Sequence, residues 1–476
     1  MFKRVFSIFV LGAMLTLTGL GCSSSAPAVP AAQAKPITLQ YWGVFTDSDQ
    51  MQILIKAFQA KHPNITIQYR KFRPEEYEQA LLQAFAEDRG PDLFTIHNDW
   101  VEGYKLRLAP MPTTLSYPVF TTTGSGINAS TQVSMQSRPG LTLKQMRDQF
   151  VRVVEDDSMA LPTAATSTQK SIFALPFYVD TLALYFNRDL LAQNGVTAPA
   201  ADWGTIRAQA EKLTKISATD NKITQSIIPM GTGTNVHVAG DIVLALMMQN
   251  GAQLSDAAHN ITFAAAPANQ NPQEETPAGA ALHFYMDFGN PAKKAYTWNP
   301  TMGDGLAAFT QGRVAYYLGY SYDMATVKAQ NPRLNFEVAL LPTPRVGDTP
   351  LNLANYWMEG VSKKSKNADA AWLFILETAT NKDALTKYLA ATHRTSALNE
   401  IIQTQQDDIE LGAFAKQNLT ARSWYHGKNS AAAQTILTDM IEEARAQLAN
   451  PDPNVTETDI YQKAVNRAQV RLNDTL

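Results

Sequence analysis

The chain has 476 residues, more than one ordinary hydrophobic core supports, so two or three domains are expected. Hydrophobic residues make up 45% of it and charged residues 17%, as in ordinary globular proteins rather than disordered ones. The formal charge of −3 offers no basic excess to neutralise phosphates, which argues against nucleic acid as the main partner.

The first 36 residues have the features of a targeting segment and a tether. Residues 1–21 carry two basic residues and then an apolar run too short to span a bilayer, which is typical of a secretory signal. Cys22, the only cysteine, is preceded by glycine and followed by three serines, and this resembles a bacterial lipoprotein cleavage site. Gly19 stands where such sites usually have leucine, and the alternative is an ordinary signal cleaved near Ala34. Residues 22–36, rich in Ala, Pro and Ser, predict a flexible tether.

The folded region begins with a β-α-β pattern. Ile37–Trp42 alternates as a strand, Ser48–His62 has the apolar spacing of an amphipathic helix, and Ile65–Tyr69 alternates again. A strand, a helix and a strand over this span predict parallel pairing with a right-handed connection. A helix at Pro74–Glu87 and a strand at Pro91–Ile96 are expected next.

Two less regular stretches follow. Thr113–Leu141 is low in charge and rich in Ser, Thr, Gly and Pro, so we interpret it as a surface insertion with no assignable chemistry. Thr142–Asp157 is predicted to be one helix, and its acidic end, Glu155–Asp157, is interpreted as a solvated face.

The stretch Leu175–Gly195 contains an apolar run, Thr181–Phe186, that leads into a short helix capped by Asn187. A run this apolar predicts a buried strand of an α/β sheet. Asp180 lies at the mouth of this strand, and a carboxylate is costly to bury without partners. It is therefore either paired in a salt bridge or turned toward a wet cleft.

The remainder alternates between helical and extended patterns. The strands expected here are Ile228–Met230 and Phe336–Pro342. The helices expected here are Thr205–Lys215, Asp241–Gln249, Pro277–Phe288, Gly303–Thr310, Asn367–Ala379 and a C-terminal pair that ends at Leu476. The glycines after Met230 lack the spacing of a dinucleotide fingerprint and the lysine of a phosphate-binding loop, so no nucleotide site is expected.

Six segments, in order, resemble the extracellular solute-binding proteins of ABC importers, of the sugar-binding, maltose-binding-protein type. They are Ala57–Gln68, Pro91–Ile96, Leu175–Gly195, Ala307–Asp323, Asn355–Gly360 and Arg422–Tyr425. The resemblance implies a two-lobed, type II periplasmic-binding-protein-like α/β fold. Each lobe would have a mainly parallel sheet flanked by helices, and a multi-strand hinge would join them. The implied lobes are residues 37–177 with 361–411, and 180–357 with 412–476.

Ligands of open α/β sheets bind beyond the carboxyl ends of the strands. Polar and aromatic residues at such ends, together with positions implied by the resemblance, form the candidate ligand-binding set. It comprises Trp42, Thr46, Asp47, Asn98, Asp99, Trp100, Tyr178, Asp180, Tyr320, Tyr322, Tyr356, Trp357 and Trp424. Trp42, Trp100 and Trp424 could instead be core residues, and Asp47 or Asp99 could be helix caps.

No catalytic or metal set is recognisable, because the seven histidines are scattered and no nucleophile elbow is present. The expected function is a solute receptor without a cofactor, anchored by Cys22 to the outer face of the cell membrane. As a monomer, it would bind a neutral mono- or oligosaccharide and deliver it to an ABC permease. The alternatives are a glycosidase that uses distant carboxylates such as Asp99 and Asp180, and a surface lipoprotein with no role in transport.

Overall fold

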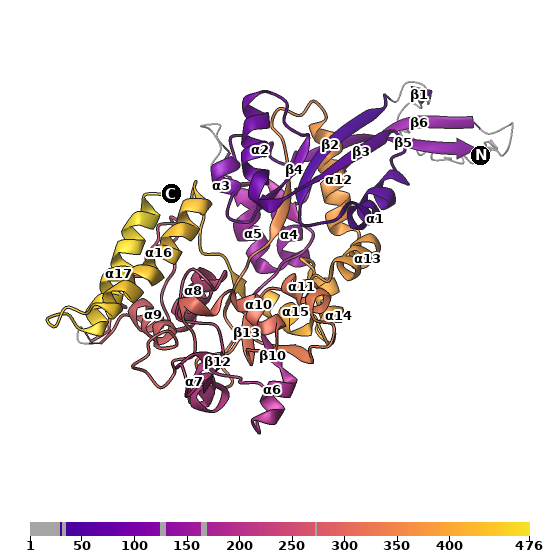
Figure 1. The fold of residues 1–476 in the computed structure, drawn as a ribbon. Coiled ribbons are helices and arrows are strands. Elements are labelled where there is room, and N and C mark those ends of the chain that lie inside the picture. The colour runs from indigo at the N-terminus through magenta and orange to yellow at the C-terminus, as the bar shows by residue number, and fades with distance from the viewer. Residues whose placement is uncertain (1–28, 31–34, 124–129, 163–168, 272–273) are drawn as a thin grey trace, which may run out of the picture.

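The computed structural model describes residues 29–30, 35–123, 130–162, 169–271 and 274–476 (Figure 1). Buried apolar side chains in these ranges form two separate cores, and each core defines a lobe. The first core draws mainly on residues 39–179 and 354–402, and the second mainly on residues 182–353 and 424–472. The lobe boundaries named above remain a proposal, since one helix contributes Phe414 to the second core and Ala415 to the first.

The first lobe is built on a five-stranded mixed sheet in the order β3-β2-β4-β16-β9. Strand β2 is parallel to β3 and β4, whereas β16 is antiparallel to β4 and β9. Its strands are β2 (Ile37–Val44), β3 (Ile65–Phe72), β4 (Leu93–His97), β9 (Ala174–Pro176) and β16 (Trp357–Val361), with the short pair β7 (Met159–Ala160) and β8 (Ser171–Ile172). Its helices are α1 (Ser48–Gln59), α2 (Pro74–Ala86), α3 (Val101–Tyr104), α4 (Leu143–Gln149), α5 (Arg152–Ser158), α12 (Ala368–Thr380), α13 (Lys382–Thr392) and α14 (Asn399–Gln405).

Helix α1 illustrates why the local pattern succeeds in this lobe. Met51, Leu54, Ile55 and Phe58 recur at helical spacing and are all buried. The Phe58 ring packs edge-on against Phe374 of α12, with 5.2 Å between the ring centroids. The predicted β-α-β unit is therefore present, with its helix held by the core.

The stretch Thr113–Leu141 is not an irregular insertion but an antiparallel hairpin of β5 (Thr114–Thr123) and β6 (Ser130–Pro139). Figure 1 shows this hairpin projecting from the first lobe. Half of its strand residues are exposed Ser, Thr and Gln, and the apolar alternation of a half-buried strand is confined to Leu115, Tyr117 and Val119. The prediction of one helix over Thr142–Asp157 is also wrong. Phe150 is extended and forms a bridge with Leu398, and this tertiary pairing separates α4 from α5.

The second lobe holds a three-stranded sheet in the order β13-β10-β14, and both pairings are antiparallel, not parallel as expected. Its strands are β10 (Ala183–Asn187), β11 (Lys215–Ile216), β12 (Ile223–Gln225), β13 (Tyr316–Gly319) and β14 (Phe336–Ala339). Its helices are α6 (Arg188–Gln193), α7 (Trp203–Leu213), α8 (Ala239–Gln249), α9 (Pro277–Asp287), η3 (Pro300–Met302), α10 (Gly305–Thr310), α11 (Asp323–Gln330), α16 (Ser430–Ala449) and α17 (Glu457–Asn473). Residues 228–230 are buried but form no strand, because the chain turns at Gly231, whose φ is +98° and whose backbone packs on Gly289.

Three segments cross between the lobes and bond to one another, forming the hinge. The first runs through Thr181, which forms an antiparallel bridge with Ala354 of the second. The Asn355 amide donates to the Asp180 carbonyl at 2.9 Å. The third crossing pairs β17 (Ala421–Arg422) in parallel with β15 (Asn352–Leu353). Helix α15 (Gly412–Asn418) leads into this third crossing.

The signal sequence and Cys22 lie outside the described residues. The described N-terminal piece β1 (Val29–Pro30) pairs antiparallel with β6, so the hairpin carries a third strand. Across the described ranges, no helix has both the length and the apolar character needed to cross a membrane.

Candidate functional site

The first lobe presents a row of aromatic rings beside the hinge. Trp357, on β16, lies 5.6 Å from Phe45 and 5.2 Å from Trp100 between ring centroids. Trp100 in turn stacks on Tyr104 at 5.2 Å. Phe45 is 41% exposed and is held at a φ of 60°, an uncommon conformation for a bulky residue that turns its ring toward Trp357. We call Phe45, Trp357 and Trp100 the aromatic row.

A hydrogen-bond network joins this row to the hinge. His97 Nδ1 lies 2.6 Å from Asp99 Oδ1, and His97 Nε2 lies 2.9 Å from Asn355 Oδ1. Burial lowers the pKa of His97, but the Asp99 carboxylate outweighs it, and the pKa rises to about 9. The ring is therefore a cation at neutral pH, and both of its nitrogens donate.

The second lobe brings a matching polar and aromatic group to the same place. Tyr320 donates its hydroxyl to Asp241 Oδ2 at 2.8 Å, and its ring stacks with Tyr322 at 5.6 Å. Burial raises the pKa of Asp241, while hydrogen bonds from Tyr320 and Asn355 favour its ionised form. Asn355 thus links His97 of the first lobe with Asp241 of the second. The Tyr322 side chain is 38% exposed.

Asp180, which precedes β10, is buried and accepts hydrogen bonds from neutral donors, so among the described residues it has neither the salt bridge nor the wet cleft expected from the sequence. The Ser321 hydroxyl donates to Oδ2 at 2.6 Å, and the Ser321 and Thr181 amides donate as well. Burial raises the pKa of Asp180 to about 6, against the opposing influence of Arg394 and these donors. Asp180 therefore ties the hinge to the second lobe.

A second buried network centres on Asp157, so the interpretation of this residue as part of a solvated face is wrong. Its side chain has 0% exposure. Oδ2 accepts from Tyr356 Oη at 2.6 Å, Ser423 Oγ at 2.7 Å and Asn98 Nδ2 at 3.1 Å. Oδ1 lies 3.2 Å from His426 Nε2. One carboxylate thus joins the first lobe to two hinge segments and to the chain entering α16.

Four other residues of the candidate set make structural contacts. Thr46 is buried and bonds to Tyr388 at 3.0 Å. Asp47 caps α1 and forms a 2.6 Å salt bridge with Lys71. The half-buried Trp42 packs against Phe72. Trp424 is 6% exposed and belongs to the second core. Their roles in ligand binding remain predictions.

Tyr178 and Arg394 complete the boundary between the lobes. Tyr178 is buried on the first hinge segment, and the Arg394 guanidinium lies 4.1 Å from its ring centroid. Arg394, like Phe45, His97, Asp241 and Asn355, was not identified from the sequence. These residues come from separate strands, helices and loops, and only the fold brings them together.

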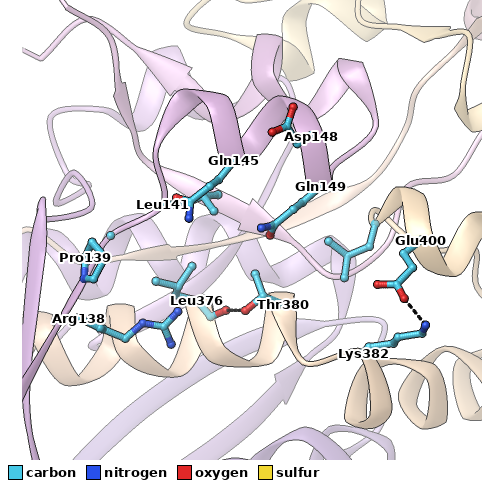
Figure 2. Close-up of a pocket in the computed structure, with 12 residues that line it drawn as sticks. Arg138, Pro139, Leu141, Gln145, Asp148, Gln149, Leu376, Thr380, Lys382 and Glu400 are labelled. Atoms are coloured by element: carbon cyan, nitrogen blue, oxygen red, sulfur yellow. Dashed lines mark hydrogen bonds and ion pairs between the residues drawn. The ribbon is translucent and has the colours of Figure 1, made fainter.

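A separate pocket of about 470 Å³ lies within the first lobe at the base of the hairpin (Figure 2). Figure 2 shows Gln145 and Gln149 of α4 above Thr380 of α12, with the Lys382–Glu400 ion pair at one edge. Its lining side chains all belong to the first lobe, so a ligand bound there could not draw two lobes together. The residues between the lobes are therefore the better candidate site.

The arrangement between the lobes suits recognition of a polar solute with apolar faces. Aromatic rings from both lobes can stack on such a solute, while the remaining acceptor positions of the Asn355 amide and the Asp241 carboxylate can bind its hydroxyls. In the part of the chain that the structure describes, no group of three or more His, Cys, Asp or Glu side chains could hold a metal ion.

Solved structures of sugar receptors share this fold at low sequence identity. The sugar-binding protein MalE from the phytopathogen Xanthomonas citri has a TM-score of 0.67 at 17% identity, covering 92% of this chain and 97% of that chain. The GacH receptor of Streptomyces glaucescens, solved unliganded and with acarbose, has a TM-score of 0.65 at 17% identity, covering 92% and 99%. The cyclic α-maltosyl-1,6-maltose binding protein from Arthrobacter globiformis has a TM-score of 0.67 at 14% identity, covering 92% and 100%.

These structures confirm the predicted two-lobed periplasmic-binding-protein-like fold. The sequence itself matches the family model for bacterial extracellular solute-binding proteins over residues 54–413, which is well over half of its length. The chain therefore belongs to the bacterial extracellular solute-binding protein family.

Proposed function

We propose that this protein is the receptor of an ABC importer and that it binds a mono- or oligosaccharide between its lobes. The observation that carries the proposal is that the aromatic row and Tyr322 both adjoin the hinge network, the row through His97 and Tyr322 through Tyr320. Sugar rings offer apolar faces for stacking and hydroxyls around their edges, so this combination of groups suits them. The sugar receptors that share the fold add support.

Binding without chemistry fits the site better than glycoside hydrolysis. Hydrolysis needs one carboxylate near the scissile bond as an acid and a second as a base or nucleophile. Asp180 is occupied by Ser321 and Thr181, and Asp99 by His97. Both carboxylates position other groups, so neither is available as a glycosidase residue.

Because both lobes contribute residues to the proposed site, we expect the lobes to close on the ligand. A ligand that touches the aromatic row and Tyr322 together interacts more strongly with a closed arrangement and shifts the population toward it. Small-angle X-ray scattering should give a smaller radius of gyration at saturating ligand than without ligand. An unchanged radius would argue for a rigid receptor.

Anchoring and delivery complete the proposal. The signal sequence, the single Cys22 and the tether support attachment of a monomer to the outer face of the cell membrane through lipid, with the permease as its partner. The binding site lies in the folded lobes, so binding does not depend on this attachment.

A thermal-shift screen of the mature protein against neutral and acidic mono- and oligosaccharides tests the proposed function. A ligand at one hundred times its dissociation constant stabilises by about 2.7 kcal/mol, or roughly 5–10 °C for a lobe of this size. Phe45→Ala should keep the ligand-free melting temperature and lose most of this shift, because Phe45 is 41% exposed. Val470→Ala, on the exposed face of α17, is the matched control. No shift with any sugar would contradict the proposal.

A further inference from the structure

Arg394 is a buried cation in the loop after α13, beside the first hinge segment. The residue is only 7% exposed, and its guanidinium stacks on the Tyr178 ring at 4.1 Å. The neighbouring His393 ends the helix in a left-handed conformation with φ of 50°, and the Thr395 carbonyl then accepts from the Val179 amide at 3.1 Å. The loop and the stacked ring thus hold Arg394 at the boundary between the lobes.

The guanidinium of Arg394 has no acceptor. Within the described ranges, it forms neither a side-chain hydrogen bond nor a salt bridge, and its one recorded contact is the Tyr178 ring. Other buried ionic groups nearby are satisfied: Asp180 accepts three donors, and Glu359 accepts from Thr95 at 2.9 Å. The groups around Arg394 stabilise its charge from a distance, but none of them accepts a hydrogen bond from it. A guanidinium whose donors lack an acceptor is expected where a ligand supplies one.

The charges around Arg394 limit which ligand fits. Asp180 faces the Arg394 guanidinium from the hinge. Tyr178 and Tyr388 face it from the first lobe, and the exposed Tyr322 faces it from the second lobe. Asp180 offsets part of the positive charge at a distance. Asp241 acts on the same Tyr322 hydroxyl as Arg394 does, so it adds a second carboxylate to the site. A dianionic phosphate would meet repulsion from both acids. A monoanion of planar shape matches the fork of the guanidinium and can accept two parallel hydrogen bonds.

We propose that the ligand is an acidic sugar, of the uronic acid class, whose carboxylate binds the Arg394 guanidinium. This inference rests on the proposed function and refines it, because the sequence alone led us to expect a neutral sugar. The ring of such a ligand would lie against the aromatic row while its carboxylate reaches Arg394. Closure would then add Tyr322 from the second lobe.

The test compares matched sugars by titration calorimetry at pH 7. The probes are glucuronic, galacturonic and mannuronic acid and their disaccharides, each paired with its neutral counterpart. The proteins are the wild type, Arg394→Met, which keeps the stacking stem, and Arg394→Lys, which keeps the charge but not the fork. Arg467→Met, which removes an exposed cation on α17, is the control for loss of one charge.

In the wild type and in Arg467→Met, one acidic sugar should bind at least about thirtyfold more tightly than its neutral counterpart. Arg394→Met should bring this ratio close to one, and Arg394→Lys should give an intermediate ratio. If Arg394→Met does not fold, Arg394→Lys alone carries the comparison. Equal binding of acidic and neutral sugars, or an unchanged ratio in the variant, overturns the inference and leaves the proposed function standing. Absence of binding by all the sugars refutes both.

Discussion

Removing the Asp157 carboxylate should destabilise the junction between the first lobe and the hinge. Asp157→Ala removes the acceptor of Tyr356, Ser423 and His426, and one of the two acceptors of Asn98, whose amide also donates to Ser423. A buried donor left unpaired costs about 1–3 kcal/mol. Tyr356 and Asn98 are 0% and 4% exposed, so water cannot readily replace the carboxylate for these two groups. Counting only these two, we expect a loss of about 4 kcal/mol.

Differential scanning calorimetry of the ligand-free protein measures this loss. About 4 kcal/mol corresponds to a fall in melting temperature of roughly 8–16 °C for a lobe of 150–250 residues. The adjacent Asp156 is exposed and makes no hydrogen bond within the described residues, so Asp156→Ala is a closely matched control. That control should change stability by less than about 0.5 kcal/mol. If both variants melt within about 2 °C of each other, which is about the size of the control effect, the Asp157 network does not hold the junction.

Three further predictions concern single residues. Trp424→Ala should lower the unfolding free energy of the ligand-free protein by about 3–5 kcal/mol, because the indole is buried in the second core. A large loss of ligand affinity with an unchanged melting temperature of the ligand-free protein would instead mark Trp424 as a residue that stacks on the ligand. Folding raises the pKa of His97 to about 9 from an unfolded-state value near 6.5. The protonated ring therefore contributes fully to folding stability below about pH 6.5, and this contribution is lost as the pH rises through about 9. Melting temperatures from pH 6 to 10 should therefore fall more steeply for the wild type than for His97→Gln, and parallel curves would contradict this. Cys22→Ala should move the protein from the membrane fraction to the soluble fraction of a bacterial host, and unchanged membrane association would exclude the lipid anchor.

Local sequence patterns predicted the β-α-β unit of the first lobe well because α1 carries apolar residues at regular spacing. Helix α1 and its flanking strands could be predicted from their own residues alone. The β5–β6 hairpin is mostly exposed, and its hydrophobic alternation is limited to three residues of β5, too few to predict two long strands. The antiparallel pairing of β10 also depends on partners more than a hundred residues away along the chain, such as Tyr317 opposite Tyr185.

The sequence pointed to residues at the strand ends but not to most of the contacts that those residues make. Trp100, Trp357 and Tyr322 lie beside the hinge, and their roles in ligand binding remain predictions. Asp157 stands in an acidic run that is typical of a solvated helix face, and its burial arises only from the meeting of three distant segments. Arg394 is a single basic residue in a loop, and its lack of a partner is a property of the fold.

The place of β16 in the first sheet has a consequence for how the protein is made and secreted. This strand lies between β4 and β9 in the sheet. It is synthesised late, because Glu359 of β16 follows its hydrogen-bond partner, Thr95 of β4, by 264 residues. Closing so long a loop is entropically unfavourable before the contacts form, which slows folding. The emerging chain would therefore stay unfolded long enough for a translocation channel to accept it. A chain that ends before Trp357 would leave β4 and β9 with open edges and should aggregate rather than fold.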